Sequence, residues 1–408
     1  MSASWVERDV ARVWHGFTQM SAYAGNAPVI VERAEGHELI DVDGKRYLDA
    51  ISSLWVTTLG HRVPELDAAL AEVVPVDEPR FLFASDGASA VEQALKIAFQ
   101  YWVNLGVEGR TSYLALGGAY HGDTVGGLSV GADGFGSDLF DPLRFPVVRA
   151  PGYGEPGWPE AAARLVEERA GELAGVVLEP LVQGAAGMKV ADPGDFAVLQ
   201  EACRRTGVLL VCDEVATGFG RTGTLFASEQ CGLRPDLLCV GKGLTGGYLP
   251  MSATVASGRV HAAFLGEDLG PRTLYHGHSF GGNALAAAVA LRHLELLRER
   301  DVLANVRARS RELAQLLEER IAPLDAVAEV RQRGLMAGVE LHPGERRGRA
   351  VCAAAVARGV LLRPIGDVVI VVPPLTITSP ELERIVDVLE HVILEAVPAS
   401  DAELARAR

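Results

Sequence analysis

A single lysine stands out among the residues that could carry chemistry. Of the 38 basic residues only four are lysines: Lys45, Lys96, Lys189 and Lys242. Lys242 alone lies between two glycines, directly after an apolar run over 237–240. A lysine that is desolvated in a crevice loses proton affinity and can act as a Schiff-base nucleophile, and flanking glycines leave room for a flat ring. For this position taken alone, a solvated loop lysine is the other interpretation.

Three further groups stand where ligands of open α/β sheets bind, after apolar runs or before a helical pattern. They are the carboxylate of Asp213 after the run 208–212, the ring of Tyr120 with His121 after the run 112–116, and the small residues Gly87 and Ala88 before a helical pattern. Small residues at a helix start expose backbone N–H groups to an anion such as phosphate. Taken singly, a helix cap or a salt bridge also explains the carboxylate, and a structural role also explains the histidine.

Together, the four positions supply a lysine, a carboxylate, an aromatic ring and a phosphate cradle. A pyridoxal phosphate (PLP) enzyme needs this set: an amine that binds the cofactor covalently, a carboxylate that keeps the pyridine nitrogen protonated, and an anchored phosphate. The sequence therefore predicts a PLP enzyme. No spacing of His, Cys, Asp and Glu is typical of a metal site, so no metal is expected.

Short apolar runs alternate with amphipathic helical stretches from about residue 81 to 256. This pattern predicts the α/β class, with a mostly parallel sheet covered by helices on both faces. The expected strands are 112–116, 175–178, 208–212, 237–240 and 252–256, and the expected helices among them are 88–105 and 195–205.

A change of composition after Asn283 indicates a second, smaller α+β domain. Long helices are expected over 284–300 and 302–320, with a last helix opened by Ser379. Near the start, runs over 29–32 and 38–47 with an Asp43-Gly44 turn are typical of a hairpin. We therefore expect an N-terminal segment 1–54 that packs with the small domain, a large PLP-binding domain 55–283 and a C-terminal small domain 284–408.

Composition narrows the range of partners. The 408 residues are 49% hydrophobic, enough for a sizeable core, and acidic residues exceed basic ones by 53 to 38. A net charge of −15 disfavours nucleic acid and anionic membranes, so a small-molecule partner is expected. The charged start and the lack of a run of about eighteen apolar residues predict a cytoplasmic protein. Five cysteines without a Cys-x-x-Cys are interpreted as buried or idle thiols.

Over essentially its whole length the sequence resembles the class III, fold-type-I PLP aminotransferases. Within them it is similar to the biotin-pathway branch, which makes 7,8-diaminononanoate from 8-amino-7-oxononanoate. The stretches that carry the resemblance are 13–20, 52–55, 118–124, 213–223, 241–247, 276–280 and 362–364. The resemblance implies a large domain with a mostly parallel seven-stranded sheet and a homodimer with shared active sites.

The resemblance also implies roles for individual residues. Lys242 would hold the cofactor covalently and move a proton, Asp213 would pair with the pyridinium nitrogen, and Tyr120 would cover the ring. Arg363 would bind the carboxylate of the keto acid, since a guanidinium can grip a carboxylate bidentately. The other residues expected to contact the cofactor are Gly87, Ala88 and His278, together with Ser279 from the partner subunit. Those expected to contact the substrate are Phe17, Leu54, Trp55 and Gly277.

Three departures from the family pattern bear on the amino donor and on the active site. Phe17 stands where many S-adenosylmethionine users have a tyrosine, and Leu54 stands where they have the first tryptophan of a pair. Loss of these groups weakens recognition of a bulky sulfonium nucleoside, and relatives that use lysine look similar at both places. The donor is thus S-adenosylmethionine or L-lysine. The third departure is the span 64–81, which is several helical turns shorter than the family usually has.

Other functions on the same scaffold remain as alternatives. An omega-amino-acid transaminase, an aminomutase or a racemase would keep Lys242 and Asp213, and a non-enzymatic relative would keep only the fold. The stretch around Trp14 and Arg363 favour the biotin-pathway aminotransferase, and the intact lysine disfavours a protein without activity.

Overall fold

The computed structural model describes most of the chain. The described residues are 6–7, 29, 31–52, 76–132, 138–267, 270–280 and 283–396. Several positions of the sequence analysis lie outside them, namely Trp14, Phe17, Leu54, Trp55 and most of the short span 64–81.

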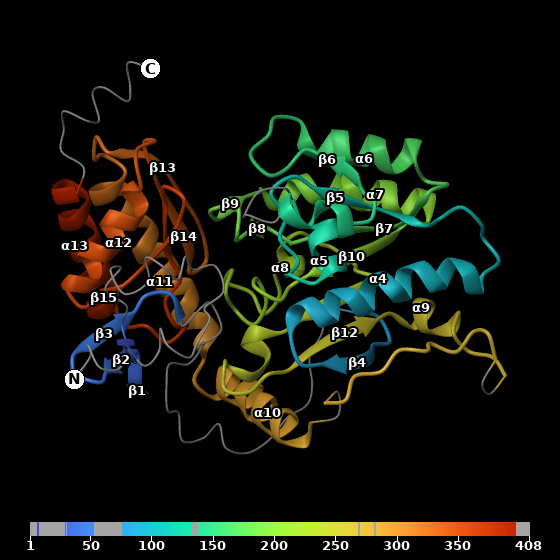
Figure 1. Ribbon diagram of the computed structural model, residues 1–408, viewed down its shortest axis with the longest axis horizontal. Coiled ribbons are helices and arrows are strands. Elements are labelled where there is room, and N and C mark those ends of the chain that lie inside the picture. The colour runs from blue at the N-terminus through green and yellow to red at the C-terminus, as the bar shows by residue number, and fades with distance from the viewer. Residues whose placement is uncertain are drawn as a thin grey trace.

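A seven-stranded sheet forms the centre of the larger part of the molecule (Figure 1). Its strands, in spatial order, are β4 (Arg80–Ala84), β12 (Ser252–Ala256), β11 (Leu237–Val240), β10 (Leu209–Asp213), β7 (Leu173–Leu178), β5 (Ser112–Leu116) and β6 (Val148–Ala150). Only β12 runs antiparallel to its neighbours. The predicted α/β fold with a mostly parallel seven-stranded sheet is confirmed, although the sequence did not predict β4 and β6.

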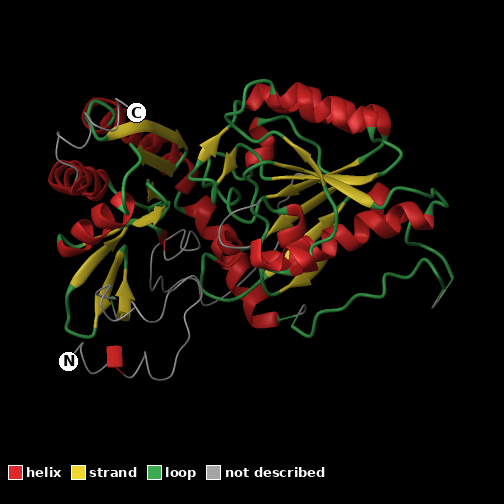
Figure 2. Cartoon of the chain, turned by 45° about the horizontal axis from the view of Figure 1, so that its top comes forward, coloured by secondary structure: helices red, strands yellow, loops and turns green. Residues whose placement is uncertain are grey.

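Alternate residues of the central strands pack into two separate cores. On β10, Leu209 and Val211 belong to the core beneath α4 (Gly87–Asn104), whereas Leu210 and Cys212 belong to the larger core on the other face. The larger core includes side chains of α6 (Trp158–Glu168) and α7 (Phe196–Thr206). Successive side chains of a strand point to opposite faces of the sheet. A strand whose side chains are buried on both faces therefore needs helices on both faces, as Figure 2 shows.

The helix boundaries follow local capping chemistry. Asp86 caps α4, since its carboxylate accepts from the backbone N–H of Ser89 at 2.9 Å. A 3₁₀ turn, Pro193–Asp195, precedes α7, which ends at Gly207 in the left-handed conformation (φ +74°). The short helices that connect strands of this part are α5 (Val125–Val130), α8 (Ala227–Gln230) and α9 (Gly258–Ala262).

The C-terminal part contains a second sheet covered by helices. Its strand order is β13 (Val327–Arg333), β14 (Met336–Leu341), β17 (Val368–Val371) and β16 (Arg363–Ile365). Its helices are α10 (Ala284–Glu299), α11 (Val302–Leu316), which continues as a π-helical turn over Leu317–Ile321, α12 (Arg347–Ala357) and α13 (Ser379–Ala396). The helix expected over 302–320 is therefore regular only to Leu316.

The N-terminal strands join this end of the molecule (Figure 1). They are β1 (Val31–Glu35), β2 (Glu38–Asp41) and β3 (Arg46–Asp49), with Gly44 in the left-handed conformation at the turn (φ +82°). β3 pairs in parallel with β15 (Val360–Leu361). A two-stranded hairpin, β8 (Val182–Gln183) and β9 (Lys189–Val190), projects from the large part and bonds to the second sheet, since Lys189 Nζ reaches Glu329 at 3.1 Å. The domain limits at 54/55 and 283/284 stay predictions.

Two further findings concern the described helices and the cysteines. None of the described helices is long and apolar enough to cross a membrane. All five cysteines are buried free thiols.

Candidate active site

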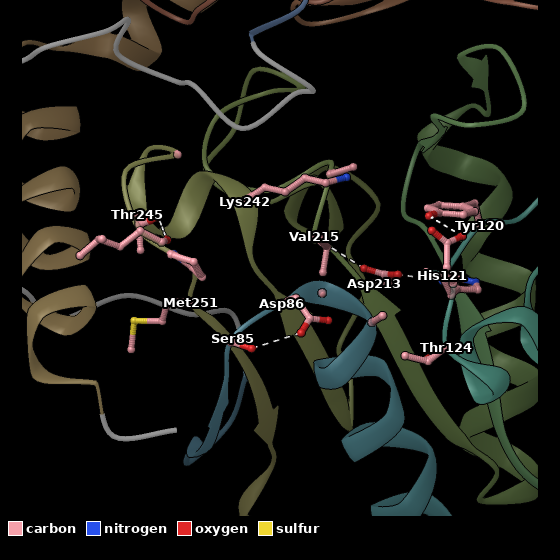
Figure 3. Close-up of a pocket in the computed structure, with 18 of the residues that line it drawn as sticks. Ser85, Asp86, Tyr120, His121, Thr124, Asp213, Val215, Lys242, Thr245 and Met251 are labelled. Carbon is pink, nitrogen blue, oxygen red and sulfur yellow. Dashed lines mark hydrogen bonds and ion pairs between the residues drawn. The ribbon is translucent and has the colours of Figure 1, made fainter. Parts of the chain in front are cut away.

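A cavity of about 700 Å³ opens at the carboxyl ends of the central strands. Its wall includes Lys242 after β11, Asp213 at the end of β10, Tyr120 after β5 and the start of α4 at Gly87 and Ala88. Figure 3 shows Lys242, Asp213 and Tyr120 approaching this space from different elements. The structure thus brings together these five residues and His121, all of which the sequence singled out.

Lys242 begins a 3₁₀ turn, Lys242–Thr245, directly after β11. Its φ of +43° lies in the left-handed region, which a residue with a side chain rarely adopts. Burial lowers the pKa of Lys242, and the carboxylates of Asp213 and Glu179 partly oppose this effect. A lysine with a lowered pKa has a larger neutral fraction and is therefore a better nucleophile.

Asp213 is held at the floor of the cavity by two neighbours. The Nδ1–H of His121 donates to its Oδ2 at 2.8 Å, and the N–H of Val215 donates to Oδ1 at 3.0 Å. The His121 side chain is fully buried, and its Nε2 has no hydrogen-bond partner among the described residues. The carboxylate therefore has a fixed orientation, with a buried imidazole beside it.

Tyr120 is fixed at both ends. Its N–H donates to Oε1 of Glu179 at 3.1 Å, and its hydroxyl donates to Oδ1 of Asp123 at 3.0 Å. Burial, with the nearby carboxylate of Asp123, raises the pKa of Tyr120, so the phenol stays protonated at neutral pH. The ring has a defined place in the wall from which it can cover a flat ligand.

The start of α4 offers donors for an anion. Asp86 accepts from Ser89, while the backbone N–H groups of Gly87 and Ala88 have no acceptor within the described part of the chain. A Cβ on Gly122 (φ +104°) would lie 2.4 Å from the Cβ of Ala88, so only glycine permits this close approach beside the donors. These features fit a bound phosphate.

Arg363 approaches the cavity from β16 of the second sheet. Burial lowers its pKa, and both Tyr120 and Lys242 lie close enough to interact with it electrostatically. No carboxylate of the described residues pairs with its guanidinium, which is half-buried. A half-buried arginine without an internal carboxylate suits the carboxylate of a ligand.

The loop 276–280 does not line the cavity. Gly277 and Ser279 are exposed, whereas Nε2 of His278 lies 3.1 Å from Oγ of Ser85, which does line it. The contacts expected from Gly277, His278 and Ser279 to ligands therefore stay predictions. The contacts expected from Phe17, Leu54 and Trp55 lie outside the described residues.

Two carboxylates of the cavity were missed by sequence reasoning. Glu179 directly follows β7, and Asp123 lies three residues after Tyr120 in the same loop. Burial raises the pKa of Glu179 to about 7. Inspecting the residue after every apolar run, as for Asp213, would have found Glu179, because Leu178 ends such a run.

Comparison with known proteins identifies the family. A family model for class III aminotransferases matches residues 19–74 and 65–393. The chain belongs to the class III aminotransferases. Members of this family depend on PLP, which confirms the cofactor predicted from the sequence.

Several relatives and solved structures in this family are similar over almost the whole chain. A protein of Nitratidesulfovibrio vulgaris named adenosylmethionine-8-amino-7-oxononanoate aminotransferase is 42% identical, covering 95% of this chain and 81% of its own. One of the same name from Aquifex aeolicus is 38% identical, covering 94% and 95%. The crystal structure of the Methanocaldococcus jannaschii aminotransferase of that name is 36% identical (TM-score 0.91), covering 97% and 99%. An omega-transaminase from Thermomicrobium roseum is 30% identical (TM-score 0.87), covering 97% and 99%.

The N. vulgaris protein is longer than this chain within the aligned region. The alignment with the N. vulgaris protein runs over 438 positions, whereas 95% of this 408-residue chain is about 388 residues, so about 50 positions of that protein have no counterpart here. The two family matches, 19–74 and 65–393, meet at 65–74. The overlap of the two matches falls within the span 64–81 that the sequence indicates to be short.

Proposed function

We propose that this protein is the PLP-dependent aminotransferase that converts 8-amino-7-oxononanoate to 7,8-diaminononanoate. The observation that carries the proposal is the common name of the relatives: eight proteins at 32–42% identity, from bacteria and an archaeon, are all named adenosylmethionine-8-amino-7-oxononanoate aminotransferase. The omega-transaminase, at 30%, is less similar, which disfavours that alternative.

The residues of the cavity fit PLP. The unpaired N–H groups of Gly87 and Ala88 would hold the phosphate, and the carboxylate of Asp213 would pair with the pyridine nitrogen. His121 donates to Asp213 and so keeps that carboxylate in place, and the ring of Tyr120 would cover the cofactor. When bound, PLP supplies an aldehyde that condenses with amines and an electron-poor ring that accepts the electron pair released at the substrate carbon.

Lys242 would have two tasks. Its Nζ, with a pKa lowered by burial, would hold the cofactor covalently through the aldehyde carbon, with release of water, and would take up the proton that leaves the substrate carbon. The carboxylate of Asp213 would lie beside the pyridine nitrogen, where it would stabilise the positive charge of the protonated ring.

Arg363 and Asp123 would orient the keto acid. The guanidinium of Arg363 would bind its carboxylate, and Asp123, hydrogen-bonded to Tyr120, would face its amino group. Phe17, Leu54, Trp55 and Gly277 stay proposed substrate contacts, and His278 and Ser279 stay proposed cofactor contacts, with Ser279 supplied by the partner subunit.

A homodimer in the cytoplasm is part of the proposal. Tyr275 and Phe280 before α10, and Leu285 in its first turn, are exposed, and a second subunit would cover them. Five buried free thiols suit a reducing compartment. Sedimentation of the purified protein tests the dimer, which Phe280→Ser is expected to weaken.

One assay tests the activity and the donor together. Purified protein is given PLP, 8-amino-7-oxononanoate and either S-adenosylmethionine or L-lysine, and 7,8-diaminononanoate is measured by mass spectrometry. The names of the relatives support S-adenosylmethionine, so product with this donor is expected. Product with lysine alone would change the donor, and product with neither would refute the proposed function.

A further inference from the structure

A buried histidine of α10 contacts the turn that carries Lys242. The ring of His293 is 0% exposed and hydrogen-bonds the backbone of Leu244, two residues after the lysine. This bond raises the pKa of His293, as expected when the ring donates to a carbonyl. Nδ1 has no hydrogen-bond partner among the described residues, so Nε2–H is the donor and the Leu244 carbonyl is the acceptor. Burial lowers the pKa of His293 to about 3, so the imidazole is neutral and has a single N–H, which Leu244 uses.

The Leu244 carbonyl depends on this side chain. Neighbouring carbonyls of the turn accept from backbone N–H groups: Gly241 from Leu244, Gly243 from Gly246, and Thr245 from Tyr248. Among the described residues, no backbone N–H outside the helices and strands reaches the Leu244 carbonyl. His293 therefore satisfies a carbonyl that would otherwise be buried without a donor.

The turn that carries Lys242 is also strained, and Phe219 packs against it. Lys242 (φ +43°) and Phe219 (φ +57°) both adopt the left-handed conformation, which persists only where surrounding contacts hold it. A Cβ on Gly243 would lie 3.0 Å from the Cβ of Phe219, so the turn rests directly on this residue. The ring of Phe219 in turn lies 6.3 Å from that of His293, centroid to centroid.

We propose that His293 is a positioning residue for Lys242, which fixes the strained turn so that the lysine amine keeps its place in the cavity. The inference rests on the proposed role of Lys242. His293 is not among the described residues that line the cavity, and it acts through the carbonyl of Leu244 and the ring of Phe219. The sequence does not indicate this contact. His293 is a lone histidine in an Ala/Leu-rich helix, and nothing in the sequence relates it to the lysine between two glycines.

Three variants separate the hydrogen bond from the packing. His293→Gln keeps an N–H donor at about the reach of Nε2, and His293→Leu removes the donor. Phe226→Leu is the matched control, because Phe226 packs on Phe219 at 5.4 Å and belongs to the same buried cluster. All three changes remove ring packing, and only His293→Leu leaves the Leu244 carbonyl without a donor.

The first measurement is hydrogen exchange of the amides over 243–248 in cofactor-free protein. His293→Leu is expected to speed exchange by about tenfold, while His293→Gln and Phe226→Leu stay within about threefold of the parent. The second is kinetics of the loaded enzyme, in which His293→Leu lowers kcat on the order of 10²-fold with little change in KM, because a small displacement of a reacting group is costly.

Clear results would overturn the proposal. It fails if His293→Leu leaves exchange and kcat within about twofold of the parent, or if Phe226→Leu has the same effects as His293→Leu. Should His293→Leu not fold, His293→Asn replaces it, since its shorter side chain does not reach Leu244; equal exchange in the Asn and Gln variants then overturns the proposal. Exchange in cofactor-free protein is independent of turnover, so a failure of the proposed function would show separately.

Discussion

Two regions at the rim of the large sheet place their side chains in opposite ways. At the carboxyl ends of β10 and β11, charged groups are buried: Asp213 is 5% exposed and is held by His121 and by the N–H of Val215. At the edge strand β4, apolar groups are exposed: Phe81 and Phe83 are 46% and 36% exposed, with their rings stacked at 6.0 Å.

The difference follows from what each region needs. A buried carboxylate is costly unless hydrogen bonds satisfy it, so its presence at a cavity indicates chemistry. Exposed aromatic rings on an edge strand bring no such chemistry and favour association. The two parts of the family match overlap at 65–74, shortly before β4, within the span that the sequence indicates to be short.

The largest effect is expected from removing the amine at the buried region. Lys242→Ala should abolish covalent attachment of PLP, seen as loss of its visible absorbance band, and lower turnover by about 10³-fold or more. Lys189→Ala is the control, because Lys189 lies outside the cavity and forms ion pairs with Glu329 and Glu340. A retained band in Lys242→Ala would show that the buried region is not the catalytic site.

A somewhat smaller loss of activity is expected from removing the negative charge of Asp213 in the buried region. Asp213→Asn keeps the shape of the side chain but loses the carboxylate beside the pyridine nitrogen, so kcat should fall by about 10²-fold. Asp236→Asn is the control: this carboxylate accepts from the N–H of Leu210 at 3.0 Å, near the start of β10, away from the cavity. Equal kinetic losses in both variants would mean that Asp213 acts only in folding.

The buried region was largely predictable from sequence because its chemistry follows strand ends. The runs expected at 112–116, 237–240 and 252–256 are strands with those limits, and the residues after two of them, Tyr120 and Lys242, line the cavity. An apolar run that ends in a polar residue is a local signal, and parallel topology then brings such ends together.

The partners of these residues could not be predicted in the same way. His121 bonds to Asp213 and His293 to Leu244, and each pair joins segments far apart in sequence. Such contacts depend on tertiary packing, and a single sequence does not indicate which distant residues lie next to each other. β4 was missed because the run Arg80–Ala84 is short and exposes both phenylalanines, so neither burial pattern of a strand is clear.

A pH-dependent effect should separate Glu179 from ordinary carboxylates. Burial raises the pKa of Glu179 from 4.5 to about 7, so the folded protein keeps a proton between these values that the unfolded chain releases. Its contribution to stability is complete below pH 4.5 and is lost as pH rises through about 7, by up to about 3 kcal/mol. Glu179→Gln should lack this loss.

Urea unfolding of cofactor-free protein over this pH range measures the difference between parent and variant. Glu318→Gln serves as control, because Glu318 is an exposed residue of the π-helical turn Leu317–Ile321. If the stability difference between Glu179→Gln and the parent did not change with pH, Glu179 would titrate normally and would not be a buried group of the cavity.

The smallest effect on stability is expected at β4. Phe81→Thr and Phe83→Thr should change the free energy of unfolding by no more than about 0.5 kcal/mol, because the rings are exposed and threonine suits a strand. Leu82→Thr is the control: Leu82 lies between them but packs against the core beneath α4, so its change should cost more than about 1 kcal/mol.

The phenylalanine variants should instead bind less of an apolar dye and self-associate less in light scattering, because they remove exposed aromatic surface. If Phe81→Thr were as destabilising as Leu82→Thr, the ring would have to be covered in solution, and the contrast between the two regions would not hold.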